Sequence, residues 1–287
     1  MNYLYSWSLM KEFRPNSAEF ARPPMPQHPS DGDFLGVLKA SGALQPWSSS
    51  PLAASAEKYV ATEATTVLAV KFKDGVLVAG DRRATAGNTI MYDRADKVLT
   101  IDDHSLLAIS GVPAMAWETA RVMQHSLKYY RRSQLQEMSL EGKVRMLSRS
   151  LQERLPMILQ GVGAVVPIFA TYDTNGNGGG GRIFFYDVLG AQFEGVDYAT
   201  TGSGSPAVRS ILYYLNNWGG RPLAKMNEND SAVTALRLLD TAAESDSATG
   251  GYNRRDKVFP LVSTITAKGI RHFAPAELAR LYKKDLA

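Results

Sequence analysis

The sequence contains no cysteine and only four histidines in 287 residues. Without thiols there can be no disulfide, thiolate zinc site or cysteine nucleophile. The absence of cysteine also favours a cytoplasmic location over an oxidising compartment. The histidines (His28, His104, His125 and His272) are far apart and share no metal-ligand spacing. A Gly-x-Ser-x-Gly elbow and a His-Glu-x-x-His pair are also lacking. These absences exclude several common hydrolytic sites.

Long apolar runs and strong charge are lacking too. No segment has the roughly 18 uninterrupted apolar residues of a membrane span, and the N-terminus does not have the pattern of a signal peptide. The net charge is only +4, and the basic residues are scattered, which favours solvated faces over nucleic-acid binding. We expect a cytoplasmic protein that binds neither membrane nor nucleic acid and needs no cofactor.

The composition changes near residue 60. Half of the 14 prolines precede this point, and the segment has no sustained periodicity, so it should be largely irregular by itself. Only residues 33–44 suggest a short helix or docking element. The segment is therefore either a disordered tail or a removable pro-segment.

Strand-like runs begin at Thr65. Residues 65–72 and 75–81 form two apolar runs joined by an Asp-Gly turn signal, and residues 97–102 and 105–110 form a second pair. Four strands should thus precede the first helix. Helical periodicity follows in 113–130 and 140–158, with Ser139 as N-cap and Pro156 as the point where the second helix ends or kinks.

The second half repeats this order. We expect strands in 164–173 and 182–190, a hairpin tip at Asn175 to Gly181, helices in 206–215 and 231–243, a last hairpin in 259–274 and a closing helix in 275–286. Strands and helices that arrive in blocks favour antiparallel sheets covered by helices. The predicted fold is α+β, a four-layer αββα sandwich.

An N-terminal threonine offers acyl-transfer chemistry without histidine or cysteine. Its own α-amino group, with an ordinary pKa of about 7.7–8.0, can act as the base for its hydroxyl. Cleavage before Thr65 would expose such a group and would give the upstream segment a purpose. Asp81 ends the second strand and Lys97 begins the third, so a lysine cation held by a carboxylate could stabilise the developing negative charge.

This pattern resembles the proteasome β-subunit, a member of the N-terminal-nucleophile hydrolases. The resemblance covers Thr65 to about Ala274 and rests on "TTVLAVKFKDGVLVAGDRRAT" with "AISG", "TGSGS" and "DSATGG" in the expected order. It implies a threonine endopeptidase of the bacterial, actinobacterial type with a 1–64 pro-segment, removed on maturation, and a 65–287 catalytic domain.

The resemblance also assigns roles to single residues. Thr65 would be the nucleophile, because the spacings to Asp81 and Lys97 fit Thr65 and not Thr66 as the first residue. Ser203, Asp246 and Thr249 would orient the threonine amine, with Thr249 standing where many relatives have serine. On the substrate side, Gly111 would be the backbone oxyanion donor and Thr85 would pair with the substrate main chain. Three residues would line the pocket for the residue before the cleaved bond: Ala84, Ala95 and Ile109. Since the pocket residues are small or apolar, we expect cleavage after apolar residues.

Two departures from the family pattern have consequences. The residue before the scissile point is Ala64 instead of glycine, and its methyl group would crowd the tight turn and slow self-cleavage or leave it incomplete. Pro113 stands where a small residue donates an N–H to the bound peptide, and proline has no N–H. One hydrogen bond to the substrate should therefore be missing.

The resemblance implies partners as well. These are further β-subunits in a heptameric ring, α-type subunits, an ATPase unfoldase and unfolded protein substrates. Three alternatives stay open: a non-cleaving structural β-subunit whose maturation Ala64 hinders, a simpler ATPase-partnered double-ring bacterial peptidase, and a small-molecule amidohydrolase with an N-terminal nucleophile.

Overall fold

The structure is a computed structural model that describes residues 65–286 apart from 87–88, 161–162 and 175–178. The proposed pro-segment, the helix expected in 33–44 and Ala64 lie outside the described residues. So does most of the expected glycine-rich tip, although the strands on either side of it pair with each other, Asp173 with Gly180.

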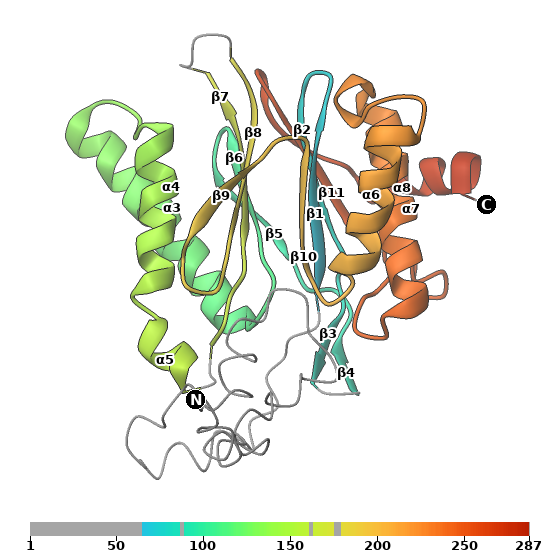
Figure 1. Cartoon of the computed structure of the whole chain (residues 1–287), viewed down its shortest axis with the longest axis horizontal. Coiled ribbons are helices and arrows are strands. Elements are labelled where there is room, and N and C mark those ends of the chain that lie inside the picture. Colours follow the sequence, from blue (N-terminus) through green and yellow to red (C-terminus); the bar gives the residue numbers. More distant parts are fainter. Residues whose placement is uncertain (1–64, 87–88, 161–162, 175–178, 287) are drawn as a thin grey trace, which may run out of the picture. The chain divides into compact units, whose positions relative to one another are not determined.

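Two five-stranded antiparallel sheets form the centre of the fold (Figure 1). The first sheet has the order β10-β1-β2-β11-β12, with bounds Tyr198–Gly202, Thr66–Phe72, Gly75–Gly80, Leu261–Thr266 and Gly269–His272. The second has the order β5-β6-β7-β8-β9, with bounds Val98–Asp102, Ser105–Ala108, Ile168–Asp173, Gly180–Tyr186 and Gln192–Gly195. β1 is thus an inner strand, held by β10 on one side and β2 on the other.

Helices cover the outer face of each sheet (Figure 1). On the β5–β9 sheet lie α3 (Pro113–Gln134) and α4 (Leu140–Gln152), and on the other sheet lie α6 (Ser205–Trp218) and α7 (Glu228–Ser245). The shorter elements are α5 (Leu155–Leu159), η1 (Leu223–Lys225), α8 (Pro275–Leu281) and η2 (Tyr282–Leu286). The predicted four-layer αββα sandwich is confirmed.

Three hydrophobic cores fill the three spaces between these layers. In β1, Leu68 and Val70 pack in the core that contains α6 and α7 side chains, whereas Val67 and Ala69 pack in the core shared by the two sheets. This alternation follows from the two-residue period of a strand. Because both faces are covered, the strand is apolar from Val67 to Val70, and burying each valine or leucine contributes about 1.5–3 kcal/mol.

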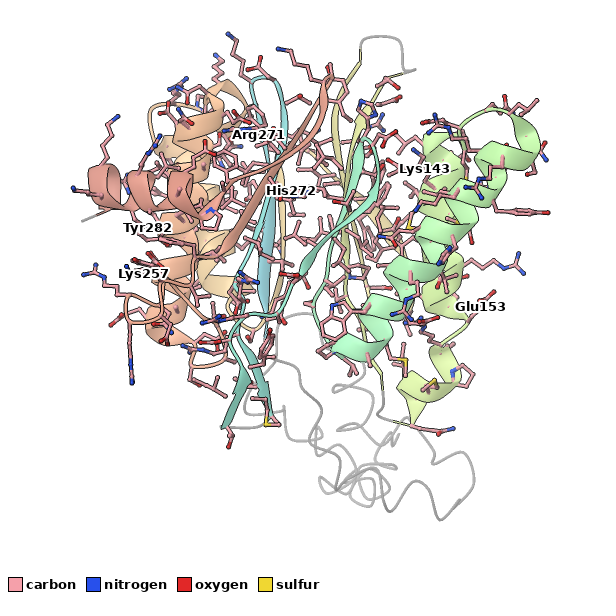
Figure 2. The ribbon with its side chains drawn as sticks, turned by 180° about the vertical axis from the view of Figure 1, so that it is seen from behind. Lys143, Glu153, Lys257, Arg271, His272 and Tyr282 are labelled. Carbon is pink, nitrogen blue, oxygen red and sulfur yellow. The ribbon has the colours of Figure 1, made fainter. Side chains whose placement is uncertain are left out.

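The helices on the β5–β9 sheet begin where the sequence indicates, but the second ends earlier than expected. Ser139 caps α4 by accepting a hydrogen bond from the Gly142 backbone N–H at 3.1 Å. The helix stops at Gln152, and Pro156 lies in the first turn of the separate helix α5. Lys143 of α4 pairs with Asp102 of β5 at 2.8 Å, which ties the helix to its sheet (Figure 2).

Within the described residues six strands precede α3, so the prediction of four strands before the first helix is wrong. The additional strands, β3 (Ala84–Ala86) and β4 (Thr89–Tyr92), form a separate two-stranded hairpin. β3 has only three residues and every β4 residue is exposed, so neither strand carries a hydrophobic alternation. Strands β9 and β10 were not predicted either.

The described helices include none that is long and apolar enough to cross a bilayer.

Candidate active site

The predicted charge partners of Thr65 meet at one end of the first sheet. Thr65 immediately precedes β1, Asp81 immediately follows β2, and Lys97 immediately precedes β5. Because β1 and β2 are antiparallel neighbours, the start of one lies beside the end of the other. Although all three residues are polar, they are almost fully buried, with exposed fractions of 4% for Thr65, 0% for Asp81 and 4% for Lys97.

The Asp81 carboxylate accepts four hydrogen bonds, two on each oxygen. Oδ1 accepts from the Thr66 backbone N–H at 2.8 Å and from Lys97 Nζ at 2.7 Å. Oδ2 accepts from the backbone N–H groups of Arg83 at 2.8 Å and Gly250 at 2.9 Å. With all its acceptor positions used, the buried carboxylate is fixed as the partner of the Lys97 cation.

Lys97 is a buried ammonium that pairs with Asp81. Its Nζ donates to Asp81 and to the Arg83 carbonyl oxygen. Burial lowers the pKa of Lys97 below its ordinary 10.5, and the attraction of Asp81 opposes that decrease. A desolvated cation of this kind interacts strongly with an anion that forms beside it.

Two glycines of the "TGSGS" motif allow the chain to pass close to Thr65 and Thr66. Gly202 has a φ of 103°, and a Cβ there would lie 1.8 Å from the Thr65 carbonyl oxygen. A Cβ on Gly204 would lie 2.5 Å from Thr66 Oγ1. As a result, the Ser203 N–H reaches the Thr65 carbonyl at 2.9 Å, and the Gly204 N–H reaches Thr66 Oγ1 at 2.9 Å.

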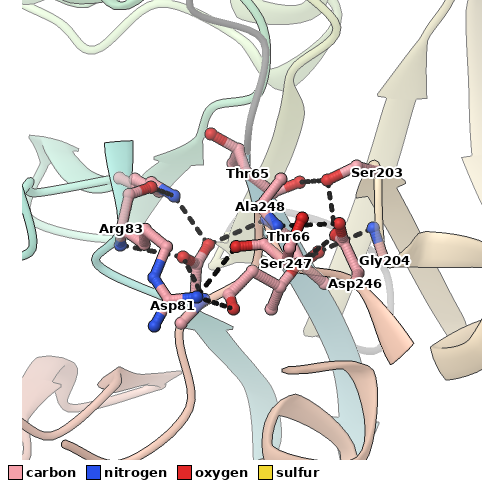
Figure 3. A network of polar contacts seen from close by, with 12 residues as sticks. Thr65, Thr66, Asp81, Arg83, Ser203, Gly204, Asp246, Ser247 and Ala248 are labelled. Atoms are coloured by element: carbon pink, nitrogen blue, oxygen red, sulfur yellow. Dashed lines mark hydrogen bonds and ion pairs between the residues drawn. The ribbon is translucent and has the colours of Figure 1, made fainter. Parts of the chain in front are cut away.

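The predicted amine-orienting residues form one network beside Thr65 (Figure 3). Asp246 Oδ2 accepts from Ser203 Oγ at 2.6 Å and from Thr249 Oγ1 at 2.5 Å. Thr249, which stands in place of serine, thus makes a hydroxyl hydrogen bond to Asp246. Thr249 and Thr66 share a further hydroxyl contact of 2.5 Å. Since the one proton of Thr249 is given to Asp246, Thr66 is the donor in that contact.

The predicted pocket residues are also brought together. Ala84, Ala95 and Ile109 line one small cavity, and Thr65 and Lys97 are part of its wall.

Gly111, the expected oxyanion donor, lies on this cavity with a φ of 101°. A side chain there would clash with the Ala164 carbonyl oxygen, 2.1 Å from the Cβ position. Pro113, in the first turn of α3, lines the cavity as well. Thr85 is the middle residue of β3, buried and paired with Ile90 of β4; its proposed pairing with a substrate main chain stays a prediction.

Sequence reasoning did not identify three residues of the site: Thr66 as a hydroxyl donor, Arg83 and Trp117. The Arg83 guanidinium donates to the carbonyl oxygens of Ser247 at 2.8 Å and Thr249 at 3.1 Å, and so holds the "DSATGG" segment against the end of β2. Trp117, in α3, is one of the residues that line the cavity. Its position four residues after Pro113 places both on one helix face, a signal that was available in the sequence.

No group of histidine, aspartate and glutamate side chains within the described ranges is arranged to hold a metal ion.

The fold and the site together define a class. An αββα sandwich with a threonine at the head of an inner strand, beside a buried aspartate–lysine pair, has the architecture of the N-terminal-nucleophile hydrolases. Within that class the chain belongs to the proteasome family, since residues 61–254 match the family described as "Proteasome subunit".

Its relatives are proteasome β-subunits of actinobacteria. "Proteasome subunit beta 2" of Thermomonospora curvata is 40% identical over 217 residues, which cover 76% of this chain and 74% of the relative. "Proteasome subunit beta" of Jonesia denitrificans is 37% identical over 220 residues, covering 77% and 70%. "Proteasome subunit beta" of Streptomyces griseus is 36% identical over 226 residues, covering 79% and 77%. We therefore assign the chain to the β-subunits of the proteasome core particle.

Proposed function

We propose that this β-subunit is an active threonine endopeptidase that removes residues 1–64 and then cleaves unfolded proteins. The observation that supports this proposal most is the buried ion pair near Thr65, in which Lys97 Nζ lies 2.7 Å from Asp81 Oδ1. Burying two charges costs several kcal/mol each unless they are well compensated. A subunit with only a structural role would have no chemical use for such a pair beside a threonine.

Self-processing would use the Thr65 hydroxyl on the preceding peptide bond. Its oxygen attacks the Ala64 carbonyl carbon, the C–N bond to Thr65 breaks, and the nitrogen takes up a proton to become the free amine. The resulting ester is hydrolysed by water, which releases residues 1–64 with a carboxyl end. The Thr65 hydroxyl is then regenerated on a chain that begins with Thr65.

Peptide hydrolysis would repeat this chemistry with the free amine as base. The amine takes the hydroxyl proton while the oxygen attacks the substrate carbonyl, and Lys97 stabilises the alkoxide. The Gly111 N–H would stabilise the oxyanion of the tetrahedral intermediate. The proton then passes to the departing amine of the substrate, and water cleaves the acyl-enzyme ester. Ser203 and Asp246 lie beside the Thr65 main chain, with Ser203 Oγ 3.4 Å from the Thr65 carbonyl oxygen, in a position to orient the new amine.

The family supports the assembly in which this would happen. A β-subunit assembles with other β-subunits and with α-type subunits, and we propose a heptameric ring, an ATPase that feeds unfolded chains, and a cytoplasmic location. The names of the relatives favour this assembly over the simpler double-ring peptidase. Substrate side chains would enter the apolar cavity beside Thr65, in agreement with the expected cleavage after apolar residues.

Intact mass spectrometry of the assembled particle tests this proposal. We expect a mature chain that begins at Thr65 and hydrolyses peptides, no processing or hydrolysis in Thr65→Ala, and both activities in Thr65→Ser, which keeps a hydroxyl. A full-length chain that persists in assembled, inactive particles would instead favour the non-cleaving structural subunit. Cleavage of small amides by an isolated dimer, without activity on peptides, would favour the amidohydrolase.

A further inference from the structure

The side chain of Thr66 lies on the other face of the chain from that of Thr65. Successive side chains of a strand point to opposite faces, and Thr66 shares its face with Leu68 and Val70, which pack in the core that contains α6 and α7 side chains. Thr65 instead lines the small cavity together with Lys97, and the described residues that line this cavity do not include Thr66. A contribution of Thr66 to catalysis must therefore act through other residues and not through contact with a side chain bound in the cavity.

The Thr66 hydroxyl joins the beginning of β1 to the ends of two helices. Gly204, the N-cap residue of α6, donates its backbone N–H to Thr66 Oγ1 at 2.9 Å (Figure 3). On the other side, Thr66 Oγ1 lies 2.5 Å from Thr249 Oγ1. Thr249 in turn donates to Asp246, the C-cap residue of α7. One hydroxyl thus connects the nucleophile strand to both helices on this face of the sheet.

The protons of this chain of hydrogen bonds can run in only one direction. A carboxylate only accepts hydrogen bonds, so Ser203 and Thr249 both donate to Asp246 Oδ2, at 2.6 and 2.5 Å. The single hydroxyl proton of Thr249 is used in this way, and Thr66 must donate to Thr249. Thr66 can then accept the Gly204 N–H. The chain ends on the same carboxylate oxygen that holds Ser203.

Bulk water cannot replace the Thr66 hydroxyl. Thr66 and Thr249 are both 0% exposed, and even a Cβ on Gly204 would lie 2.5 Å from Thr66 Oγ1 and 2.9 Å from Thr249 Oγ1. Without the Thr66 hydroxyl, the Gly204 N–H loses its acceptor and Thr249 loses its donor. Because Thr249 and Ser203 bind one oxygen of Asp246, a displacement of Thr249 also reaches Ser203.

We propose that Thr66 is a positioning residue whose hydroxyl holds Asp246 and Ser203 where they orient the Thr65 amine. This inference rests on the proposed peptidase function and adds a residue to its machinery. A misplacement of about 1 Å can reduce the rate about 100-fold. Thr66→Val, which keeps the shape of the side chain and removes its hydroxyl, should therefore lower kcat about 10- to 100-fold. KM should change less than about twofold, because Thr66 does not line the cavity.

Hydrolysis of one fluorogenic peptide by assembled particles measures kcat and KM separately. Rates are divided by the amount of mature chain, which intact mass spectrometry gives, so that incomplete processing does not count as slow turnover. Thr66→Ser keeps the hydroxyl and should retain kcat within about threefold of wild type. Recovery in Thr66→Ser would show that the hydroxyl, and not the fit of the side chain in the core, is responsible.

Thr171→Val is the matched control. Thr171 of β7 is also a buried strand threonine, 3% exposed. Its hydroxyl makes two hydrogen bonds, one with Ser105 Oγ at 3.0 Å and one to the His104 carbonyl oxygen at 2.9 Å. These partners lie beyond the end of β5 that is remote from Lys97. Thr171→Val should leave kcat within about twofold of wild type.

A double variant tests whether Thr66 acts through Thr249. Thr249→Val interrupts the same chain of hydrogen bonds one step closer to Asp246. If both hydroxyls act through Asp246, the loss of kcat in Thr66→Val with Thr249→Val should be about that of Thr249→Val alone. Two losses that multiply would show that Thr66 acts independently, which contradicts the proposal.

The possible failures can be distinguished. An active wild type with equal kcat in Thr66→Val and Thr171→Val overturns the inference and leaves the peptidase function intact. So does a loss that lies wholly in KM, or a Thr66→Ser variant as slow as Thr66→Val. If Thr66→Val does not assemble, a normal kcat in Thr249→Val overturns the inference as well. If wild type stays full length and cleaves no peptide, the proposed function fails and the inference fails with it.

Discussion

Replacing Asp81 by asparagine should destabilise the folded chain severely, although the two side chains have the same shape. The carboxylate accepts on both oxygens, from Thr66 N–H and Lys97 Nζ on one and from Arg83 N–H and Gly250 N–H on the other. An asparagine presents one oxygen and one NH₂ group. In either orientation of the amide, two donors face another donor instead of an acceptor.

The larger part of the loss comes from Lys97. Its ammonium is buried, with 4% exposed, and Asp81 is the only carboxylate with which it forms an ion pair in the described part of the chain. Removing one partner of a buried pair costs about 3–5 kcal/mol because the remaining charge is uncompensated. With a urea slope of about 2–3 kcal/mol/M, the unfolding midpoint should fall by about 1–2.5 M.

Urea denaturation of the full-length chain, followed by far-ultraviolet circular dichroism, measures this decrease. Asp96→Asn is the matched control, because it removes the charge of a carboxylate that is 65% exposed in its pair with Arg82 and should cost only about 0–1 kcal/mol. Adding Lys97→Met to Asp81→Asn should recover part of the lost stability, since the buried cation is then removed together with the carboxylate that balances it. If Asp81→Asn unfolds at the same urea concentration as Asp96→Asn, the assignment of the buried pair is refuted.

Three shorter predictions concern maturation and turnover. Ala64→Gly should speed the appearance of the mature chain in a mass-spectrometric time course, and an unchanged rate would mean that the methyl group is no hindrance. Burial lowers the pKa of Lys97 below 10.5, and Asp81 opposes this decrease. Because hydrolysis needs the Lys97 cation, its rate should decline below pH 10.5 in wild type and at still lower pH in Asp81→Asn. Identical pH–rate profiles for the two proteins would contradict this prediction. Pro113→Ala restores a backbone N–H that can donate to the bound peptide. One hydrogen bond contributes about 0.5–1.5 kcal/mol, so the KM of peptides should fall about two- to tenfold. A KM equal to that of wild type would show that this hydrogen bond is not formed.

The sequence predicted the parts of the fold that local chemistry determines. The β1–β2 hairpin has two apolar runs around an Asp-Gly turn, so it was predicted with nearly correct bounds. α4 has both a period and a cap, so its start was predicted correctly, although it ends at Gln152 and not near Pro156. β3, with three residues, and β10, "YATTG", carry no such pattern. β10 is a strand because β1 offers it hydrogen-bonding partners, from Thr66↔Gly202 to Val70↔Tyr198. That information lies in the pairing of distant segments.

The residues of the candidate site also fall into a group that the sequence predicts and a group that it does not. Thr65, Asp81 and Lys97 were proposed from their residue types and their places at strand ends, and the structure brings them together. The role of Arg83 was not predicted, because its guanidinium binds the carbonyl oxygens of Ser247 and Thr249, which lie more than 160 positions away in the sequence. In a sequence, an arginine exposed on the surface cannot be distinguished from one that holds two chain segments together. Only the fold distinguishes them.

The position of β1 also explains how a chain terminus can serve as a catalytic group. Terminal residues are usually poorly ordered unless a sheet holds them, yet cleavage before Thr65 would make it the first residue of the chain. Here the Thr65 carbonyl is bonded by the Ser203 N–H at 2.9 Å, and Thr66 is bonded to Asp81 through both its N–H, at 2.8 Å, and its carbonyl oxygen, at 3.1 Å. None of these bonds involves the peptide group that would be cut. The new terminus would therefore keep its place beside the sheet, at the cavity that Thr65 and Lys97 both line.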